Sequence, residues 1–353
     1  MVCFGKFIDW SYFKEFNFRD FLGGEYQESF NDFFKDKLPV YNKLTFLKNN
    51  FDVLTGQTVS NGVLVRGQEL IKIHKLPNEG KIELLNLHTY RFSKDLDKQC
   101  YYLFIPSKLQ LTDSVFKFYG DSELKDEIDL SKRQNFILLE SNILYENLKE
   151  VNAYYRTSNR LNSYGAYLLY RSNMKKLGKN VYDIENFNIH HVVDDYYGEL
   201  YSRNFSKNIN PDTIDIFKFN GKDIDFNVQE IYANGTVLKR NTIYDLGRIN
   251  DYDKTHVIFG GNAVLKDVET NLEEKEKLLV FSDDSINNMM QFLPLHYKKI
   301  TVVNLREIYY SKDEVLKKIK TINKNDYDKI LFIYQIESLN DDEQFRNLKY
   351  FKG

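Results

Sequence analysis

Two polar turns in the sequence carry residue types that take part in acyl transfer. Ser282-Asp283-Asp284-Ser285 comes directly after an apolar run at residues 278–281 and before a helical pattern over residues 286–293. A serine on a turn between a strand and a helix can expose its hydroxyl oxygen as a nucleophile. A serine or Asp283 can equally cap the helix by accepting hydrogen bonds from its first backbone N–H groups. The sequence leaves both interpretations of this turn open.

The second polar turn is Gly260-Gly261-Asn262, which follows the apolar run at residues 256–259. Two glycines let the backbone turn tightly and present N–H groups, and Asn262 adds a side-chain amide. Such donors can form an oxyanion hole, which stabilises the negative charge that develops during acyl transfer. The alternative is a plain turn at the exit of a strand.

A serine nucleophile also needs a base within hydrogen-bond distance, and neither turn contains one. The chain has six histidines, and any histidine base must be one of them: His74, His88, His190, His191, His256 and His296. The fold would therefore have to bring a histidine from a distant position.

Metal and cofactor chemistry is not expected. His190-His191-Val192-Val193-Asp194-Asp195 offers four potential ligands, but adjacent histidines on a strand face opposite ways and no HExxH spacing occurs. The two cysteines, Cys3 and Cys100, are too few for a four-sulfur site or a disulfide framework. Neither GxxxxGK[ST] nor GxGxxG is present, so no nucleotide cofactor is predicted.

Composition and charge exclude further classes of protein. The 353 residues include 49 Lys+Arg and 51 Asp+Glu, a net charge of −2, which argues against nucleic acid as a partner and against a polybasic membrane surface. A hydrophobic content of 42% is ample for a packed core. The sequence shows no apolar run of transmembrane length and no signal-peptide pattern, so a membrane anchor would have to lie outside it.

Gly120-Asp121-Ser122 spells the nucleophile tripeptide of the GDSL-type hydrolases. Those enzymes place it directly after their first strand and carry Asp-x-x-His near the C-terminus. Residues 339–353 contain no histidine, so we interpret the tripeptide as part of a loop.

The elements that must position these residues alternate between strands and helices. Strands are predicted at residues 63–65, 100–105, 213–219, 256–259, 278–281, 300–303 and 330–334, and helices at residues 136–148, 164–176, 286–293 and 312–322. This order predicts an α/β domain over residues 76–353, with a mostly parallel central sheet covered on both faces, after a helical segment over residues 1–75. Ligands of such sheets bind at the carboxyl ends of the strands.

Residues 153–167, Ala153-Tyr154-Tyr155-Arg156-Thr157-Ser158-Asn159-Arg160-Leu161-Asn162-Ser163-Tyr164-Gly165-Ala166-Tyr167, resemble the signature YY-x-T-D-H-H-W-T-x-x-G-A-Y of the DHHW family. Further blocks resemble the family in the same order: residues 105–109, 198–202, 211–213, 259–262, 278–284, 292–297, 302–306 and 327–332. The resemblance implies an SGNH-hydrolase-like three-layer fold with circularly permuted strand order, related to the alginate O-acetylation proteins.

The resemblance also implies that the catalytic positions have changed. The orienting Asp of the family falls on Ser158, the basic His on Arg160, the nucleophilic Ser on Asp284, and the Lys before it on Ser282. Arginine stays protonated at physiological pH and cannot accept a proton. We therefore predict an ion pair between Arg160 and Asp284 across the former active site.

The function that follows is a degenerate, non-catalytic protein of bacterial cell-surface polysaccharide modification, which acts as a binding or assembly component. The alternative is a residual O-acetyltransferase or acetylesterase that uses Ser285 or Ser158. Carbohydrate and a membrane acyltransferase are the implied partners, and the implied location is extracytoplasmic or at the cell surface.

Overall fold

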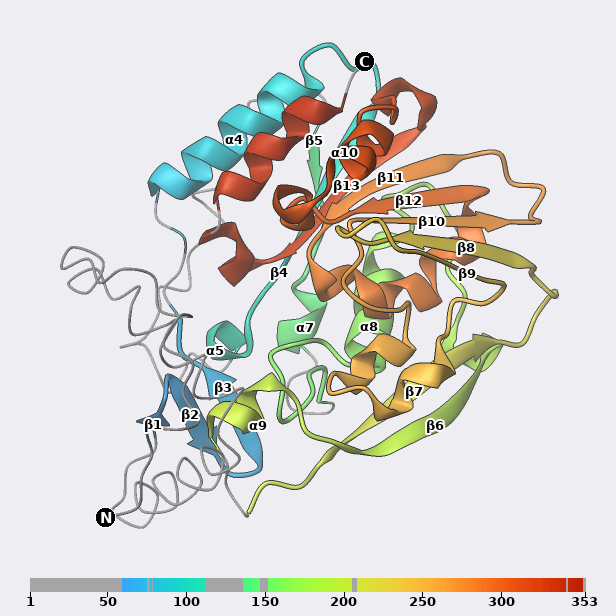
Figure 1. Ribbon diagram of the computed structural model, residues 1–353. Helices are drawn as coiled ribbons and strands as arrows, with labels where there is room; N and C mark the ends of the chain where they lie inside the picture. The colour runs from blue at the N-terminus through green and yellow to red at the C-terminus, as the bar shows by residue number, and fades with distance from the viewer. Residues whose placement is uncertain are drawn as a thin grey trace, which may run out of the picture.

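The computed structural model describes residues 59–74, 77, 79–111, 136–146, 152–204, 208–340 and 342–351 (Figure 1). The tripeptide Gly120-Asp121-Ser122 and Cys3 lie outside the described residues, as does most of the segment over residues 1–75 that was expected to be helical.

A single large sheet of eight strands forms the centre of the described chain. In spatial order its strands are β5 (Phe136–Leu138), β4 (Gln99–Ile105), β13 (Lys329–Gln335), β11 (Lys277–Ser282), β12 (Lys299–Val303), β10 (Leu265–Thr270), β8 (Phe226–Ile231) and β9 (Val237–Arg240). The first five strands run parallel, and the last three pair antiparallel. The α/β fold with its parallel sheet is confirmed, and the parallel half carries the polar turn after β11.

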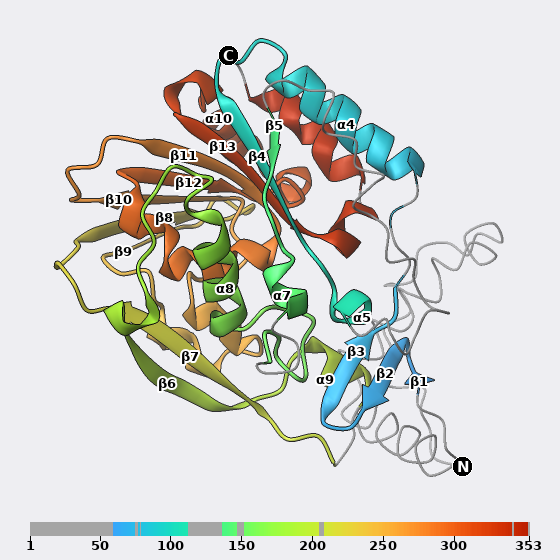
Figure 2. The ribbon, with the colours of Figure 1, turned by 180° about the vertical axis from the view of Figure 1, so that it is seen from behind.

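Helices cover both faces of this sheet, so its central strands are apolar throughout (Figures 1 and 2). Along β4, Tyr101 and Leu103 face one core with α8 (Ser163–Asn173) and the 3₁₀ helix η7 (Asp284–Gln291). Tyr102 and Phe104 face the opposite core, together with α4 (Glu79–Ser93), α10 (Asp313–Ile319) and η12 (Asp342–Tyr350). This alternation produces three layers, as predicted.

Smaller elements surround the three layers. The remaining strands are β6 (Phe187–Tyr196) and β7 (Asp212–Phe219), which form a separate ribbon, and β1 (Val59–Ser60), β2 (Val63–Arg66) and β3 (Glu69–Lys72), which form a small sheet. The other helices are α5 (Lys108–Leu111), α7 (Ile143–Glu146), α9 (Glu199–Arg203), η4 (Ile184–Asn186), η5 (Leu246–Asn250), η6 (Lys254–Val257), η8 (Leu293–His296), η9 (Glu307–Tyr310), η10 (Lys324–Asp326) and η11 (Ile336–Asn340). None of the helices in the described ranges is long and apolar enough to cross a membrane.

Three predictions about elements were wrong in part. Residues 256–259 are not a strand: the Asp253 side chain caps η6, and Phe259 and Gly260 turn the chain with φ of 69° and 75°. Residues 136–138 are an edge strand beside β4, and a helix begins only at Ile143. Residues 59–72, within the segment described as helical, form the three strands of the small sheet, and the strand predicted at residues 63–65 is confirmed as part of β2. A domain boundary at residue 76 stays a prediction.

Helix α8 begins within the signature segment, at Ser163. The Asn162 side chain caps it by accepting a hydrogen bond of 2.9 Å from the Gly165 N–H. A side chain at Gly165 would place its Cβ 2.2 Å from the Ala153 carbonyl oxygen, so the close approach of helix and loop requires glycine. These contacts fix the loop before α8, which contains Ser158 and Arg160.

Candidate functional site

The loop that carries Ser158 and Arg160 is held from both sides. Tyr154 and Leu161 pair as an isolated antiparallel bridge at its base. The Asp212 carboxylate, at the start of β7, accepts hydrogen bonds from the backbone N–H groups of Arg156 (2.6 Å) and Thr157 (2.9 Å) and from the Thr157 hydroxyl (2.6 Å). A loop anchored by charge-assisted hydrogen bonds has little freedom, so Arg160 is presented in one direction.

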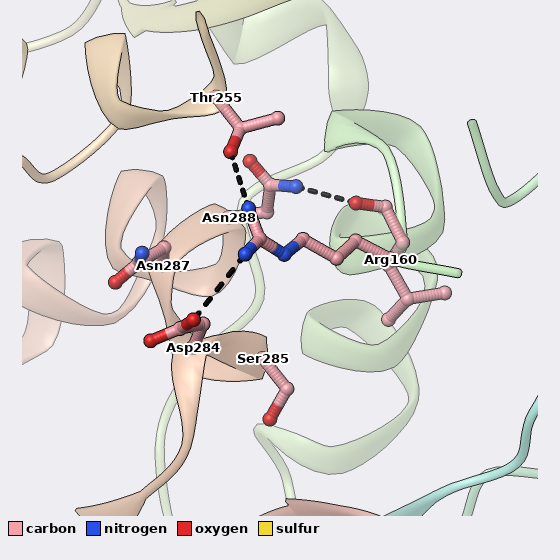
Figure 3. A pocket seen from close by; sticks show the side chains of 7 residues that line it. Arg160, Thr255, Asp284, Ser285, Asn287 and Asn288 are labelled. Carbon is pink, nitrogen blue, oxygen red and sulfur yellow. Dashed lines mark hydrogen bonds and ion pairs between the residues drawn. The ribbon is translucent and has the colours of Figure 1, made fainter. Parts of the chain in front are cut away.

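Arg160 reaches from this loop to the turn after β11, and the predicted ion pair with Asp284 is confirmed (Figure 3). Its Nη2 lies 3.3 Å from Asp284 Oδ2, and its Nη1 donates to Thr255 Oγ1 at 2.7 Å. Nη1 also pairs with the Asp253 carboxylate. The side chain is 22% exposed and spans two carboxylates that come from different elements.

Arg160, Asp253, Thr255 and Asp284 form the Arg160 cluster, in which the sequence predicted neither Asp253 nor Thr255. Asp253 precedes η6 and accepts hydrogen bonds from the Thr255 N–H and hydroxyl. Burial is the largest single influence on the pKa of Asp253 and would raise it, but Arg160, together with His256 and the hydrogen bond from Thr255, lowers it below its usual value. Burial likewise opposes the charge of Arg160, but Asp253 and Asp284 raise the pKa of the guanidinium above its usual value. Both partners therefore remain ionised at neutral pH.

Little space remains around the guanidinium. The hollow beside it has a volume of about 10 Å³, which is room for about one water molecule. It is lined by Arg160, Leu161, Thr255, Asp284, Ser285, Asn287 and Asn288. An acetyl ester cannot occupy this hollow unless side chains move.

The hydroxyl groups of Ser158 and Ser282 make hydrogen bonds within the protein. Ser158 exposes no surface, and its Oγ accepts a hydrogen bond of 3.2 Å from the Arg160 N–H. Ser282 is 1% exposed and donates to the Asp283 carbonyl at 2.7 Å. Ser285 donates its backbone N–H to the Asp283 carboxylate at 2.9 Å, and its hydroxyl points away from Arg160 in Figure 3. Asp283 is thus the residue that caps η7.

The turn Gly260-Gly261-Asn262 follows η6 and does not line the hollow beside Arg160. The carbonyl before it, that of Phe259, accepts a hydrogen bond of 2.8 Å from the buried Lys266 ammonium. A Cβ at Gly260 would lie 1.9 Å from a carboxylate oxygen of Glu230, so glycine is required there for packing as well as for its positive φ. The geometry supports a packed turn, and a role as oxyanion hole stays a prediction.

One histidine does arrive at the site through the fold. His256, on η6, lies with Nε2 3.5 Å from Asp253 Oδ2, and its side chain is 16% exposed. Burial is the main cause that lowers the pKa of His256, so its imidazole is neutral at pH 7. No hydrogen bond joins His256 to Ser158 or Ser285 in the described part of the chain.

Two other histidines make hydrogen bonds away from the Arg160 cluster. His296 Nε2 lies 2.9 Å from the Tyr170 hydroxyl, and burial lowers the pKa of His296 to about 4. His74 lies 2.7 Å from the Ser107 hydroxyl, a spacing suited to a nucleophile and its base. Ser107 exposes no surface, however, so a substrate cannot reach this pair.

The residues considered as metal ligands lie on the β6–β7 ribbon. His191 pairs there with Asp215 of the neighbouring strand. Within the ranges that the structure describes, no group of three or more His, Cys, Asp or Glu side chains is placed to share a metal ion.

Comparisons with known proteins agree with this fold. Residues 136–303 match the family model of the DHHW protein family. The crystal structure of a DHHW family protein from Eubacterium siraeum is 16% identical, with a TM-score of 0.64 over 82% of this chain and 96% of that one. Bacillus cereus PatB1, solved with a sulfonyl adduct, is 17% identical, with a TM-score of 0.61 over 82% of this chain and 98% of PatB1. No curated protein matches. The resemblance to the DHHW family is confirmed, and so is the fold.

Proposed function

We propose that this chain, which resembles the DHHW family and has the fold of a solved member, is a non-catalytic component of cell-surface polysaccharide modification. It would act by binding or assembly rather than by acyl transfer. The observation that carries the proposal is the side chain of Arg160, which is held between Asp253 and Asp284; the resemblance implies that this residue takes the place of the family's basic histidine.

The chemistry of acyl transfer explains why this arrangement supports the proposal. The base must take a proton from the nucleophile, and a guanidinium with a raised pKa cannot do so. The nucleophile position holds Asp284, whose carboxylate is engaged by Arg160. Loss of a whole triad typically lowers the turnover rate about 10⁶-fold. The reaction then remains roughly 10³–10⁴-fold faster than in water, owing to the oxyanion hole and substrate binding.

The second candidate function is a residual acetylesterase or O-acetyltransferase. It is favoured by the position of His256, which is neutral and lies beside Asp253 at the edge of the same cluster. In this alternative the Ser285 hydroxyl attacks the acetyl carbonyl and its proton passes to the imidazole of His256, which returns it to the alcohol oxygen that leaves as the ester bond breaks. Water or an acceptor hydroxyl then takes the acetyl group from Ser285. Ser285 would first have to turn toward the imidazole.

Hydrolysis of a chromogenic acetyl ester separates the two functions. We expect the wild-type chain to turn over the ester no faster than the Ser285→Ala, Ser158→Ala and His256→Gln variants, because no serine in the cluster has a histidine bonded to it. A wild-type rate that is lost in both Ser285→Ala and His256→Gln would contradict the proposal and establish the second function.

The extracytoplasmic location and the two partners are part of the same proposal. Their support is the resemblance to proteins of O-acetylation, which implies a carbohydrate ligand and a neighbouring membrane acyltransferase. Co-purification of the chain with such an acyltransferase would test the assembly role, and an acyltransferase that never co-purifies would count against it.

A further inference from the structure

A second and larger hollow lies on the face of the sheet opposite α8. It sits between α4 and η12, which Figure 1 shows side by side near the C-terminal end of the chain. Its volume is about 380 Å³, within the usual range for small-molecule sites. None of its lining residues belongs to the Arg160 cluster.

Basic side chains form the rim of this hollow. His88 and Arg91 come from α4, Lys324 from η10, and Arg346 and Lys349 from η12, whereas no acidic side chain lines it. This gathering stands out because the whole chain has a net charge of −2. The hollow is therefore a local region of positive potential on a slightly acidic protein.

Arg346 of the rim forms a weak ion pair with Glu343. Glu343 lies 3.6 Å from Arg346 on the same helix, and both side chains are more than half exposed. Exposed pairs of this kind contribute about 0–1 kcal/mol, so Glu343 leaves Arg346 able to bind an anion.

Apolar residues form the floor of the hollow. Phe92, Leu348 and Phe351 are each 3–4% exposed. The rings of Phe92 and Phe351 pack against Phe281 of β11, with centroid distances of 5.3 and 4.9 Å. The floor is thus part of the hydrophobic core on this face of the sheet.

Lys324 connects the rim to the floor. It is 5% exposed, donates a hydrogen bond of 2.7 Å to the Phe92 carbonyl, and lies 5.1 Å from the centre of the Phe92 ring. An ammonium group carries three N–H donors, and this carbonyl uses one. Burial lowers the pKa of Lys324, and the charge of the nearby Asp95 offsets part of this effect.

Helix capping explains only part of this arrangement. Arg91 and Lys349 stand in the last turns of their helices, where cations offset the negative end of the helix dipole. Capping also accounts for the hydrogen bond from Lys324 to the Phe92 carbonyl, which lies in the last turn of α4, but it does not account for an apolar floor beneath a basic rim.

We propose that this hollow binds a small phosphorylated ligand with an apolar body. A phosphate monoester carries a charge close to −2 at neutral pH, so it offsets more of the rim than a single carboxylate does. Guanidinium groups bind phosphate oxygens in pairs of parallel hydrogen bonds, which suits Arg91 and Arg346. The apolar body of the ligand would lie on Phe92, Leu348 and Phe351.

Calorimetric titration of the intact chain with phenyl phosphate, inorganic phosphate and benzoate tests this proposal. We expect phenyl phosphate to bind saturably at one site per chain, and both other probes to bind more weakly, because each lacks either the ring or the second charge. Removing two charge-assisted contacts in the Arg91→Gln/Arg346→Gln variant should weaken the affinity about tenfold or more.

The control is the Arg66→Gln/Arg171→Gln variant, which removes the same two charges from exposed positions elsewhere. It should bind phenyl phosphate as the wild type does. The proposal is overturned if phenyl phosphate shows no saturable binding, if benzoate or inorganic phosphate binds equally well, or if the two double variants have the same affinity. These outcomes are independent of the ester assay.

Discussion

Replacing Arg160 by methionine should lower the free energy of unfolding by about 2 kcal/mol. The variant leaves Asp253 and Asp284 partly buried without their shared cation. Removing one partner of a fully buried pair costs about 3–5 kcal/mol, and the exposure of about a fifth of each side chain reduces this figure. Urea unfolding at pH 7 measures the change directly.

The matched control is Arg171→Met on the exposed side of α8, which should change stability by no more than about 0.5 kcal/mol. Adding Asp253→Asn and Asp284→Asn to Arg160→Met should restore part of the loss, since the uncompensated charges are then gone. An Arg160→Met variant as stable as the wild type would show that the cluster does not hold the loop.

The ion pair between Arg160 and Asp253 also predicts how the free energy of unfolding changes with pH. Arg160 lowers the pKa of Asp253 in the folded chain, so this stabilisation is present above the unfolded pKa and is lost as the pH falls through the folded pKa. The difference between the wild type and Arg160→Met should therefore be largest near neutral pH and should shrink below about pH 4.

Rebuilding the triad should create activity. In the variant Ser158→Asp/Arg160→His/Asp284→Ser, we expect hydrolysis of an activated acetyl ester at least about 100-fold faster than in the wild type, the lower range for general base catalysis. The frame around these positions remains: Asp212 anchors the loop, and Asp283 caps η7. The shorter side chains at positions 160 and 284 also widen a hollow that now has room for about one water molecule.

A matched variant with Asp284→Ala in place of Asp284→Ser has the base but no nucleophile, and it should stay at the wild-type rate. Equal rates in the two triple variants would contradict the proposal that only the residues at the catalytic positions have changed. The surrounding geometry would then have changed as well.

The sequence predicted the parts of the molecule that depend on local patterns. The apolar runs of β4, β11 and β13 are continuous because helices cover both faces of the sheet, and continuous runs are easy to recognise. The Arg160–Asp284 pair was predicted because the resemblance to the DHHW family implies that both residues take catalytic positions, which must lie close together in the fold.

The rest depended on contacts that no local pattern encodes. Residues 256–259 resemble a strand in composition, but a capping carboxylate and two positive φ angles determine their shape. Asp253 stands 93 residues from Arg160 and belongs to no motif. The basic hollow draws its side chains from three separated segments, so its charge does not appear as a run in the sequence.

The most direct test of the central claim is covalent labelling of the intact chain by phenylmethylsulfonyl fluoride, read by intact mass. Bacillus cereus PatB1, which has been solved with a sulfonyl adduct, serves as the positive control. The account predicts no adduct, because Ser158 is enclosed and no histidine is bonded to Ser285 in the described chain. One sulfonyl group per chain, mapped to Ser285 and absent in His256→Gln, would contradict it.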